Sequence, residues 1–598
     1  MSMKWKRTHT CGDLRSSDIG KKAVLMGWVE KRRDHGGLIF IDLRDRYGIT
    51  QIRIDPACKV YEDAKKLRSE YVAGFQGRVE RRPDNMENKN LSTGEVELVA
   101  EDIDLMSIAQ TPPFQISGKI SSSEDLRLKY RYLDLRNRNM QRNLMIRHQT
   151  AQLVRNYFSE NGFIEIETPF LMKSTPEGAR DFLVPSRVWN GRFYALPQSP
   201  QTYKQLLMMS GFDRYFQIVR CFRDEDLRAD RQPEFTQIDV EMSFIDEEDI
   251  FAIVERLVQK IFTEIIGVQL NLPFQRLSYE EAMMNYGSDK PDLRFGAKIH
   301  NLSALAKESD FQIFRQTIES GGLVAGICAK GCAAYSRKQI DSLTEQAKSF
   351  GAKGLVAIKI KDSDWESTLN KYFGDAQRQA IIGELAASDG DLILIVADQQ
   401  DIVLDTLGQL RLALAREENW VPSDRYEFTW IVDFPLFEYS KEEQRYVARH
   451  HPFTSPNLAD LDKLQAHPQD VHARAYDLVL NGSEIAGGSI RISDEKIQSK
   501  MFQVLGISHQ EAHDKFGYLL EALTYGTPPH GGIAFGFDRL VMVLTDSSSI
   551  REVIAFPKTA SAMSLMDGAP AQVSERQLQE LGLQFVQELH KPSSENAE

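Results

Sequence analysis

The 598-residue sequence has few cysteines, and they are scattered: Cys11, Cys58, Cys221, Cys328 and Cys332. An odd number of dispersed cysteines in so long a chain excludes a secreted disulfide scaffold. The nearest pair, Cys328 and Cys332, has no second pair or clustered histidine, so it lacks the ligand set of a zinc site. We therefore interpret all five as reduced thiols.

Long apolar runs are also absent. No run approaches the ~18 residues needed to cross a bilayer, and residues 392–397 are typical of the longest. Residues 1–10 carry positive charge, but no apolar segment of the kind found in a signal peptide follows them. We expect a soluble, cytoplasmic protein with no membrane partner.

Four common nucleotide, metal and hydrolase motifs are missing. The chain contains no G-x-x-x-x-G-K-[ST], G-x-G-x-x-G, H-E-x-x-H or G-x-S-x-G sequence. A nucleotide bound by this protein is therefore held neither on a P-loop nor on a Rossmann turn.

The charge is uneven along the chain. The whole protein carries 73 basic and 86 acidic residues, for a net charge of −13. Residues 1–55 differ, because they hold twelve basic and seven acidic residues, a local excess of five positive charges. A basic segment on an acidic body can direct a polyanion to one end of the protein.

The apolar pattern predicts an α+β multidomain protein. Short strand patterns at 24–29, 38–43 and 49–54, with two more before residue 110 and a helical stretch at 61–67, predict a small barrel of the OB type. Most later strand patterns lack the spacing of parallel βαβ units. We therefore expect an antiparallel sheet in the body of the protein.

The pattern of predicted helices and strands changes within the body of the protein. Between about 290 and 415, strand patterns at 311–314, 322–328, 354–360 and 391–397 alternate with helices, which predicts an inserted α/β region. The predicted segments are the barrel (1–110), a hinge (111–128), the first part of the sheet domain (129–289), the insertion (290–418), the second part of the sheet domain (419–560) and a C-terminal extension (561–598).

Three clusters carry candidate chemistry. Arg223 directly follows an apolar strand, where its rigid fork is well placed for a phosphate, with Glu225 on the same face. Arg539 lies at a strand-to-helix junction behind Gly536. Glu484 and Arg491 flank a double glycine within a strand, which indicates a bulge or a close approach to a ligand. A solvated charged hairpin is the alternative at Arg223, but the apolar strands on both sides oppose it.

These clusters resemble known motifs. Residues 167–169, 223–225 and 536–539 are similar to the three motifs of class II aminoacyl-tRNA synthetases, and 174–181, 198–201, 230–237 and 481–488 resemble bacterial aspartyl-tRNA synthetases. The resemblance covers nearly the whole chain. It implies an N-terminal OB-fold anticodon-binding domain, a class II antiparallel catalytic sheet, an inserted α/β domain of the GAD type, and a homodimer built on the first motif.

The resemblance also implies a reaction and its residues. The α-carboxylate of L-aspartate attacks the α-phosphate of ATP, and a ribose hydroxyl of tRNA then takes the aspartyl group from the adenylate. The work is orientation and charge neutralisation. The residues implied for aspartate are Glu177, Gln201, Lys204, Arg223, His450 and Arg491. Those implied for ATP are Arg223, Asp224, Glu225, Gln232, Glu484, Gly536, Phe537, Asp538 and Arg539. Glu484 and Asp477 are implied as ligands of Mg²⁺.

Lys204 and Arg491 bear on the choice of amino acid. Two cations suit a side-chain carboxylate, whereas an asparagine pocket does not need them and a lysine pocket needs acids. A silent relative that only binds RNA, and a stand-alone amidating enzyme, are the alternatives from other classes. The phosphate-handling residues oppose the first, and the N-terminal barrel opposes the second.

The barrel carries the candidate tRNA contacts. Phe40 is a candidate for stacking on a base, since its parity opposes that of Ile39 and Ile41; a barrel-core aromatic is the alternative. Gln51 is the candidate for a base edge. His35 before two glycines resembles the non-discriminating subtype, which charges both tRNA(Asp) and tRNA(Asn), and Asn85 is a second marker position. Two alternatives stay open. His35 is a turn residue that does not read the tRNA, or the protein is a discriminating enzyme specific for tRNA(Asp).

Overall fold

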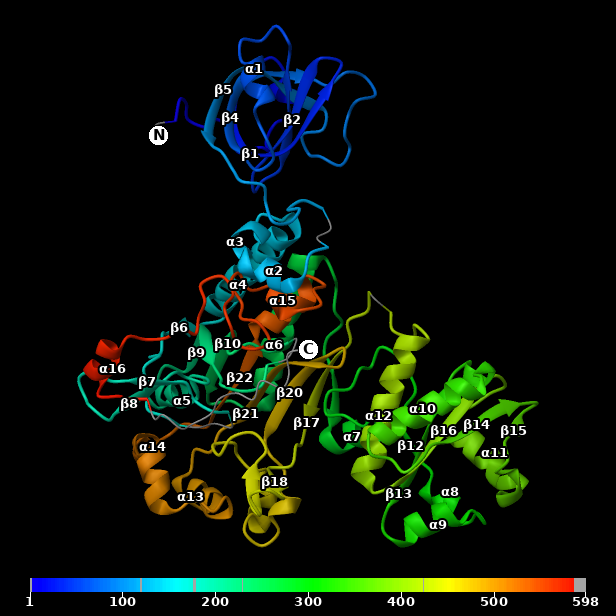
Figure 1. Cartoon of the computed structure of the whole chain (residues 1–598). Coiled ribbons are helices and arrows are strands. Elements are labelled where there is room, and N and C mark those ends of the chain that lie inside the picture. Colours follow the sequence, from blue (N-terminus) through cyan, green and yellow to red (C-terminus); the bar gives the residue numbers. More distant parts are fainter. Residues whose placement is uncertain (1–2, 119–120, 176–178, 228–229, 423, 586–598) are drawn as a thin grey trace. The chain divides into compact units, whose positions relative to one another are not determined.

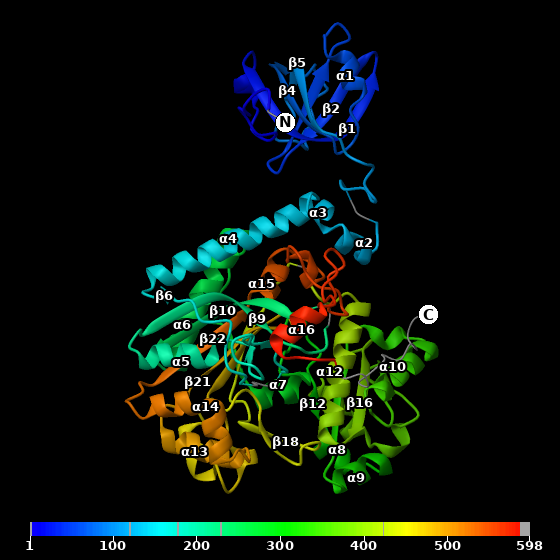
Figure 2. The ribbon, with the colours of Figure 1, turned by 60° about the vertical axis from the view of Figure 1, so that its left-hand side comes forward.

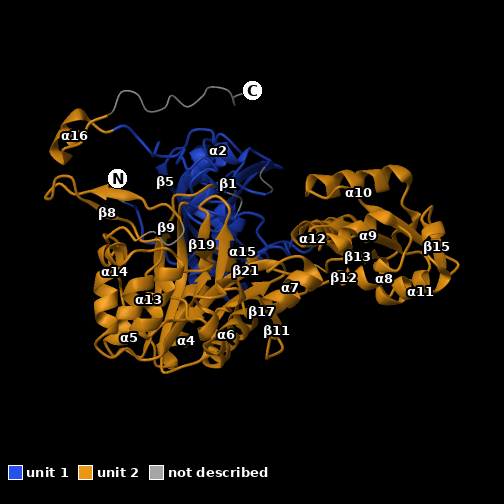
Figure 3. Ribbon diagram, turned by 90° about the horizontal axis from the view of Figure 1, so that it is seen from below, with its two compact units in different colours: residues 1–148, 227–232, 545–572 blue, residues 149–226, 233–544, 573–598 orange. Residues whose placement is uncertain are grey.

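The computed structural model describes residues 3–118, 121–175, 179–227, 230–422 and 424–585. The chain divides into two compact units, coloured separately in Figure 3. One unit comprises residues 1–148, 227–232 and 545–572, and the other comprises 149–226, 233–544 and 573–598.

The first unit contains a closed five-stranded barrel with the strand order β1-β2-β3-β5-β4, drawn in blue in Figure 1. Its elements are β1 (Lys22–His35), β2 (Leu38–Arg44), β3 (Ile49–Ile54), α1 (Tyr61–Lys65), β4 (Val72–Arg81) and β5 (Val96–Ser107). Alternate residues of β2, such as Ile39 and Ile41, fill the barrel core, as the period of a strand requires. The predicted OB barrel is confirmed.

Three helices follow the barrel: α2 (Glu124–Lys129), α3 (Arg131–Asp134) and α4 (Arg138–Glu160). Arg136, between α3 and α4, donates to Glu70 of the barrel at 2.8 Å. Arg131 is buried and donates to the carbonyl oxygens of Ile554 and Ala555 at 2.8 and 2.9 Å. These bonds hold the segment 545–572 against α3 although about 420 residues separate them in sequence.

The second unit is built on an eight-stranded sheet with the order β11-β17-β20-β21-β22-β10-β9-β6 (Figure 1). The strands are β6 (Ile164–Glu165), β9 (Arg214–Phe222), β10 (Glu234–Ser243), β11 (Gln275–Ser278), β17 (Phe428–Val432), β20 (Ala475–Leu480), β21 (Ser483–Ile490) and β22 (His530–Gly536). All neighbours are antiparallel except β6 with β9 and β11 with β17. The expected antiparallel sheet is confirmed.

Helices and hairpins surround this sheet. They are β7 (Leu183–Pro185), β8 (Phe193–Ala195), α5 (Gln201–Met209), α6 (Glu247–Ile261), α7 (Tyr279–Tyr286), β18 (Phe437–Ser440), β19 (Arg445–Ala448), α13 (Glu495–Val504), α14 (His509–Leu523), α15 (Phe537–Leu544) and α16 (Glu575–Leu581). Phe251 of α6 packs against Trp430 and Tyr476 of the sheet, with ring centres 4.4 and 5.3 Å apart. Because side chains alternate along a strand, Asp477 beside Tyr476 points to the opposite face.

The insertion forms its own five-stranded sheet, with the order β12-β13-β16-β14-β15. Its strands are β12 (His300–Asn301), β13 (Leu323–Ala329), β14 (Val356–Lys361), β15 (Asp364–Glu366) and β16 (Leu392–Asp398), and its helices are α8 (Ser303–Lys307), α9 (Gln312–Glu319), α10 (Arg337–Ser349), α11 (Asp375–Glu384) and α12 (Gln400–Glu417). Helices α10 and α12 cover one face and α8, α9 and α11 the other (Figures 1 and 2). The pairs of strands are all antiparallel.

One predicted strand of the insertion is wrong. Residues 311–314 begin α9 instead, because Phe311, Phe314 and Ile318 recur at helical spacing and pack on one face. A window of four residues is too short to distinguish the period of a strand from that of a helix. Within the described residues, no helix has the length and apolar character required to span a membrane.

Candidate active site

Four buried charged side chains meet on one face of the large sheet. Lys204 of α5 lies with its Nζ 2.7 Å from Asp239 Oδ1 and 3.3 Å from Glu241 Oε2. Arg491, directly after β21, donates from Nε and Nη2 to the two oxygens of Glu241 at 2.8 and 3.1 Å. None of the four is more than 3% exposed. Two cations therefore stand against two carboxylates in a site that excludes water.

The sequence of β10 explains this placement. Ile238, Val240 and Met242 face one side and are buried apolar residues, so Asp239 and Glu241 point to the other. Opposite Glu241 stands Gly532 of β22. A Cβ at Gly532 would lie 2.0 Å from Glu241 Oε2, so only glycine leaves room for this carboxylate.

The two carboxylates differ in acidity. Burial raises the pKa of Asp239 to about 6, although Lys204 opposes the shift. Burial also opposes ionisation of Glu241, but the charges of Arg491 and Lys204 outweigh it and lower that pKa to about 2. The four groups are balanced in charge at neutral pH, and the cluster becomes positive as Asp239 takes up a proton below about pH 6.

Two neighbouring histidines lie beside this cluster. His451 Nε2 accepts from Arg491 Nη1 at 2.6 Å, and the same Nη1 donates to Ser489 Oγ at 2.6 Å. Burial lowers the pKa of His450 to about 4 and that of His451 well below its ordinary value. Both imidazoles are therefore neutral near pH 7. The sequence assigned a role to His450 and none to His451, yet His451 is the one that contacts Arg491.

Several buried polar atoms of three predicted substrate residues and of Asp239 lack a hydrogen-bond partner within the described chain. They are Gln201 Nε2, Arg223 Nε, Asp239 Oδ2 and His450 Nδ1. A buried polar group without a partner costs about 1–3 kcal/mol. The free donors of Gln201 and Arg223 suit ligand oxygens, and the free oxygen of Asp239 suits an ammonium group. A zwitterionic ligand would satisfy both kinds.

Arg223 lies at the end of β9, as predicted. Its backbone N–H donates to Pro233 O at 2.9 Å, and its guanidinium lies 5.1 Å from the centre of the Phe235 ring. Asp224 is exposed. Its backbone N–H donates to Arg180 O at 3.1 Å, and its carbonyl oxygen accepts from Arg180 Nε at 3.4 Å. Glu225 is half-buried. The hairpin that carries Arg223 is thus anchored on both sides.

Gln232 belongs to the first unit and is 3% exposed. Its Oε1 accepts from Lys558 N at 2.7 Å and its Nε2 donates to Lys558 O at 3.1 Å. The amide is engaged at both ends with the backbone of that unit.

The last motif is mostly built into the core. Phe537 and Asp538 are each 2% exposed, and the Asp538 carboxylate accepts from Thr236 N at 2.7 Å. Arg539 donates to the carbonyl oxygen of Glu484. Gly536 is different, since a Cβ there would only make an ordinary contact at 3.7 Å. Packing among the described residues does not require a glycine at this position.

Asp477 of β20 and Glu484 of β21, the two carboxylates predicted to bind Mg²⁺, lie on neighbouring strands. The pairing of β20 with β21 passes from Leu478 and Ala486 to Val479 and Glu484, so Ile485 forms a bulge. The double glycine lies beside this bulge and pairs in regular register. A Cβ at Gly487 would lie 2.6 Å from Asp477 Oδ1 and 3.5 Å from Glu484 Oε1, so glycine opens a cradle between the carboxylates. Burial and the charge of Glu484 raise the pKa of Asp477 well above its ordinary value.

A lysine already contacts this pair. Lys290 Nζ lies 2.8 Å from Glu484 Oε2. Burial alone would raise the pKa of Glu484, but Lys290 and Arg539 lower it. The described residues hold no group of three or more His, Cys, Asp or Glu side chains suited to a metal ion. Two carboxylates and open space instead fit a hard cation that keeps substrate oxygens as its other ligands.

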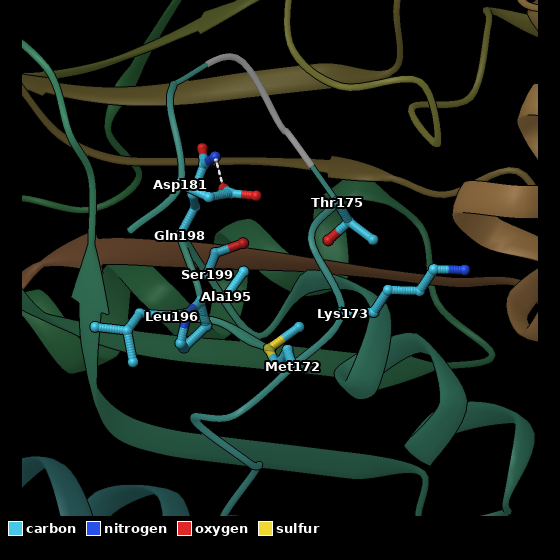
Figure 4. Close-up of a pocket in the computed structure, with 9 residues that line it drawn as sticks. Met172, Lys173, Thr175, Asp181, Ala195, Leu196, Gln198 and Ser199 are labelled. Carbon is cyan, nitrogen blue, oxygen red and sulfur yellow. Dashed lines mark hydrogen bonds between the residues drawn. The ribbon is translucent and has the colours of Figure 1, made fainter. Parts of the chain in front are cut away.

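A small polar pocket lies near residues 174–181 (Figure 4). Gln198 and Asp181 point toward each other there, with Nε2 2.5 Å from Oδ1, and Asp181 also accepts from Ser174 Oγ at 2.7 Å. The Gln198 amide pairs with the backbone of Ala179 as well. Two segments singled out in the sequence thus meet. Glu177, predicted for the same loop, lies outside the described residues.

The outer face of the barrel carries the predicted tRNA residues. Phe40 is half-buried between Arg33 and Arg53 on the neighbouring strands, while Ile39 and Ile41 fill the core. The parity argument is therefore confirmed. Gln51 donates to Glu97 at 2.7 Å and accepts from Arg33 at 3.3 Å.

The two marker positions are exposed. His35 ends β1 before Gly36 and Gly37, both with positive φ. Asn85 lies between β4 and β5 with φ +65, which asparagine tolerates better than most residues.

Several site residues escaped the sequence reasoning. Asp239 and Glu241 were read as part of a strand, although two acids alternating with Ile, Val and Met are a signal of a polar site on a sheet. His451, Lys290 and Ser489 carried no comparable signal, because their partners are distant in sequence.

Comparisons with known proteins agree with this geometry. Residues 123–560 match the family model described as "tRNA synthetases class II (D, K and N)", and residues 23–106 match "OB-fold nucleic acid binding domain". A protein of Caldanaerobacter subterraneus named Aspartate--tRNA(Asp/Asn) ligase is 55% identical over 97% of this chain and 98% of its own. One of the same name from Geotalea uraniireducens is 54% identical over 97% and 98%.

Solved structures share the fold at low identity. The asparaginyl-tRNA synthetase of Pyrococcus horikoshii, complexed with asparaginyl-adenylate, aligns over 93% of this chain and 98% of its own with a TM-score of 0.57 and 18% identity. The aspartyl tRNA synthetase of Entamoeba histolytica aligns over 92% and 91% with a TM-score of 0.57 and 19% identity.

Proposed function

This chain belongs to the class II tRNA synthetases of the D, K and N group, and on that premise we propose that it attaches L-aspartate to tRNA at the expense of ATP, through an aspartyl-adenylate. The observation that carries the proposal is the set of buried, unpartnered polar atoms on Gln201, Arg223 and Asp239, beside two buried cations. The complementary ligand is a small zwitterion with an additional carboxylate.

The choice of amino acid rests on Lys204 and Arg491. The Nε and Nη2 edge of Arg491 is taken by Glu241, so the side-chain carboxylate of aspartate meets the Nη1 end, where it displaces or joins His451 and Ser489. The free oxygen of Asp239, with Glu177, receives the α-ammonium group. Asparagine would present a neutral oxygen to Nη1, and a neutral oxygen is a weaker acceptor than a carboxylate.

The nucleotide is oriented by arginines. Arg223 neutralises charge as the aspartate carboxylate attacks the α-phosphate, and Arg539 holds the far end of the phosphate chain, with Gly536 leaving room for the base. Asp224 and Glu225 are further proposed contacts of the nucleotide, and for Gln232 this role rests on the motif resemblance alone. Phe537 and Asp538 position this motif from the core.

Asp477 and Glu484 are the residues that would hold Mg²⁺. The cation would neutralise phosphate charge when bound. The cradle opposite Gly487 and the oxygen-only donor set suit it.

The barrel reads the anticodon, with Phe40 stacking on a base and Gln51 contacting a base edge. We propose that both tRNA(Asp) and tRNA(Asn) are charged, which His35 and the names of the full-length relatives support. Asn85 is the second position near the discriminating base. The alternative is an enzyme specific for tRNA(Asp).

The cellular location, the oligomeric state and the domain bounds are further parts of this proposal. The protein acts in the cytoplasm as a homodimer, and its domains span 1–110, 129–289 with 419–560, and 290–418. The hinge is 111–128 and the C-terminal extension 561–598. The apolar side chains of Ile164 and Leu171, 50% and 53% exposed, support a covered surface around the first motif.

The test is aspartylation of tRNA(Asp) and tRNA(Asn) transcripts side by side with ATP and Mg²⁺. We expect comparable kcat/KM on both. A preference of about a hundredfold for tRNA(Asp), equal to about 2.7 kcal/mol, would support the specific enzyme instead. An Arg223→Ala variant that kept full ATP–pyrophosphate exchange would refute the mechanism.

A further inference from the structure

Lys290 has no part in the function proposed above, yet it contacts one of the two cation-binding carboxylates. It follows α7 at the start of the segment that enters the insertion. Its Nζ lies 2.8 Å from Glu484 Oε2, and its backbone N–H donates to Ser288 Oγ at 3.0 Å. The side chains of Lys290 and Glu484 are 41% and 34% exposed, so the ammonium can leave without opening a packed core.

The contact offsets a repulsion. Asp477 and Glu484 both border the cradle opposite Gly487, and two carboxylates so close destabilise each other when both are ionised. The lysine ammonium supplies one positive charge at the edge of this pair. A divalent cation in the cradle would supply the same compensation more strongly, and it would need the Glu484 oxygen that Lys290 holds.

The segment that carries Lys290 is fixed by the insertion. Arg411 of α12 is 1% exposed and donates through Nη2 to the carbonyl oxygens of Asp292 and Gly296 at 3.0 and 3.2 Å. Its guanidinium lies 4.4 and 5.1 Å from the ring centres of Phe295 and Tyr286.

The other side of this segment meets the catalytic sheet. The turn between β20 and β21 approaches it so closely that a Cβ at Gly482 would lie 3.3 Å from Asp292 Cβ. The backbone two residues after Lys290 is thus held between α12 and the sheet.

We propose that Lys290 is a resident counter-cation that occupies Glu484 while no divalent cation is bound, and that a divalent cation at Asp477 and Glu484 displaces it. The inference rests on the proposed function only for the assignment of a cation to this pair. It gives the insertion a task that its own sheet does not reveal. By fixing the base of Lys290, α12 sets how strongly the lysine competes with the cation.

The test measures direct binding of Mn²⁺ to the full-length protein without ATP. The electron paramagnetic resonance signal of free Mn²⁺ reports the binding, and the change in Tm that Mn²⁺ causes is measured as well. Removal of a competing positive charge in Lys290→Met should tighten binding by about tenfold, equal to about 1.4 kcal/mol, and should enlarge the Tm increase. Lys290→Arg keeps the charge and should behave as the wild type.

Lys298→Met is the matched control. It removes the same charge from the same segment, but Lys298 lies over the Tyr286 ring at 5.9 Å rather than on a carboxylate. Equal effects of the two methionine variants, or Mn²⁺ binding and Tm responses of Lys290→Met no stronger than those of the wild type, would overturn the inference. So would a tightening by Lys290→Met that persists in a Glu484→Gln background.

The outcome is separable from the fate of the proposed function. If the wild type charges no tRNA while Lys290→Met still binds Mn²⁺ more tightly, the counter-cation stands and the synthetase activity fails. If the wild type charges tRNA, and the wild type and Lys290→Met bind Mn²⁺ with equal affinity, the synthetase activity stands and the counter-cation is refuted.

Discussion

Arg491 and Glu241 meet edge to edge, with Nε 2.8 Å from Oε1 and Nη2 3.1 Å from Oε2, and neither residue is more than 3% exposed. This two-point contact fixes the plane of the guanidinium. The Nη1 end is then aimed at Ser489 and His451 rather than left to rotate. The buried ion pair therefore fixes the direction of the third donor, Nη1.

Replacement of Arg491 by lysine should separate charge from geometry. Arg491→Lys keeps the positive charge but loses the fork. We expect the KM for aspartate in ATP–pyrophosphate exchange to rise by about a hundredfold, or about 2.7 kcal/mol, with little change in the KM for ATP. Arg474→Lys is the control, because Arg474 makes a similar two-point pair with Glu247 at 2.7 and 2.6 Å. Equal KM values in the two variants would contradict the assignment.

A methyl group at Gly487 should close the cation cradle. Gly487→Ala places a Cβ 2.6 Å from Asp477 Oδ1, so we expect loss of the Tm increase caused by Mn²⁺ and a destabilisation of about 1–3 kcal/mol from overpacking. Gly354→Ala, where no atom lies within 4 Å of the new Cβ, should change neither. Differential scanning calorimetry with and without Mn²⁺ checks both, and an unaltered Mn²⁺ response in Gly487→Ala would refute the site.

Stability should fall in mild acid because of buried imidazoles. His530 is fully buried, and burial lowers its pKa below 6.5 in the folded state. Below about pH 6.5 this histidine binds a proton in the unfolded chain but not in the folded chain. The free energy of unfolding therefore falls by up to about 1.4 kcal/mol per pH unit. His530→Gln should lose less Tm than the wild type between pH 7 and 5. Parallel Tm curves for the two proteins would show that His530 does not contribute.

We expect Asp538 to contribute more to the stability of the fold than to the reaction. Asp538→Ala leaves the Thr236 N–H without the acceptor it has at 2.7 Å, at a cost of about 1–3 kcal/mol. We expect a lower Tm and weaker urea resistance, with a proportionate loss of activity at elevated temperature. Asp424→Ala, at an exposed position, should leave Tm within the error of the measurement. A Tm of Asp538→Ala equal to that of the wild type would contradict this role.

The turn at His35 should control the choice of tRNA. His35→Leu replaces an exposed polar side chain beside Gly36 and Gly37. We expect kcat/KM for tRNA(Asn) to fall at least tenfold while that for tRNA(Asp) changes by less than about twofold, with ATP–pyrophosphate exchange unaltered. Equal losses on both tRNAs would mean that the turn contributes only general affinity.

The sequence predicted elements better than it predicted partners. The barrel could be predicted because Ile39 and Ile41 alternate with Phe40 over a long enough strand. The apparent strand at 311–314 misled because four residues are too few to distinguish a period of two from a helical one. The two adjacent glycines indicated a bulge, but the bulged residue is Ile485. The close approach of Asp477 and Gly532, which are distant in sequence or on another strand, is what requires glycine at 487 and 488.

The charge network could not be read in the same way. Lys204 and Arg491 stood out as cations, but their contacts with Asp239 and Glu241 join residues 35 and 250 positions apart. Only the folded sheet brings these together. Motif membership likewise favoured Phe537 and Asp538 as ligand contacts, whereas their burial depends on how α15 follows β22.

The glycines at positions 488 and 532 make the centre of this sheet resistant to substitution. A Cβ at Gly488 would lie 2.1 Å from Gly532 O, and one at Gly532 would lie 2.1 Å from Val240 O. Backbone, rather than a side chain that could repack, blocks every replacement there. A second substitution elsewhere therefore cannot make room for a side chain. In a saturation library, active clones should carry only glycine at these positions, whatever substitutions the surrounding helices accept.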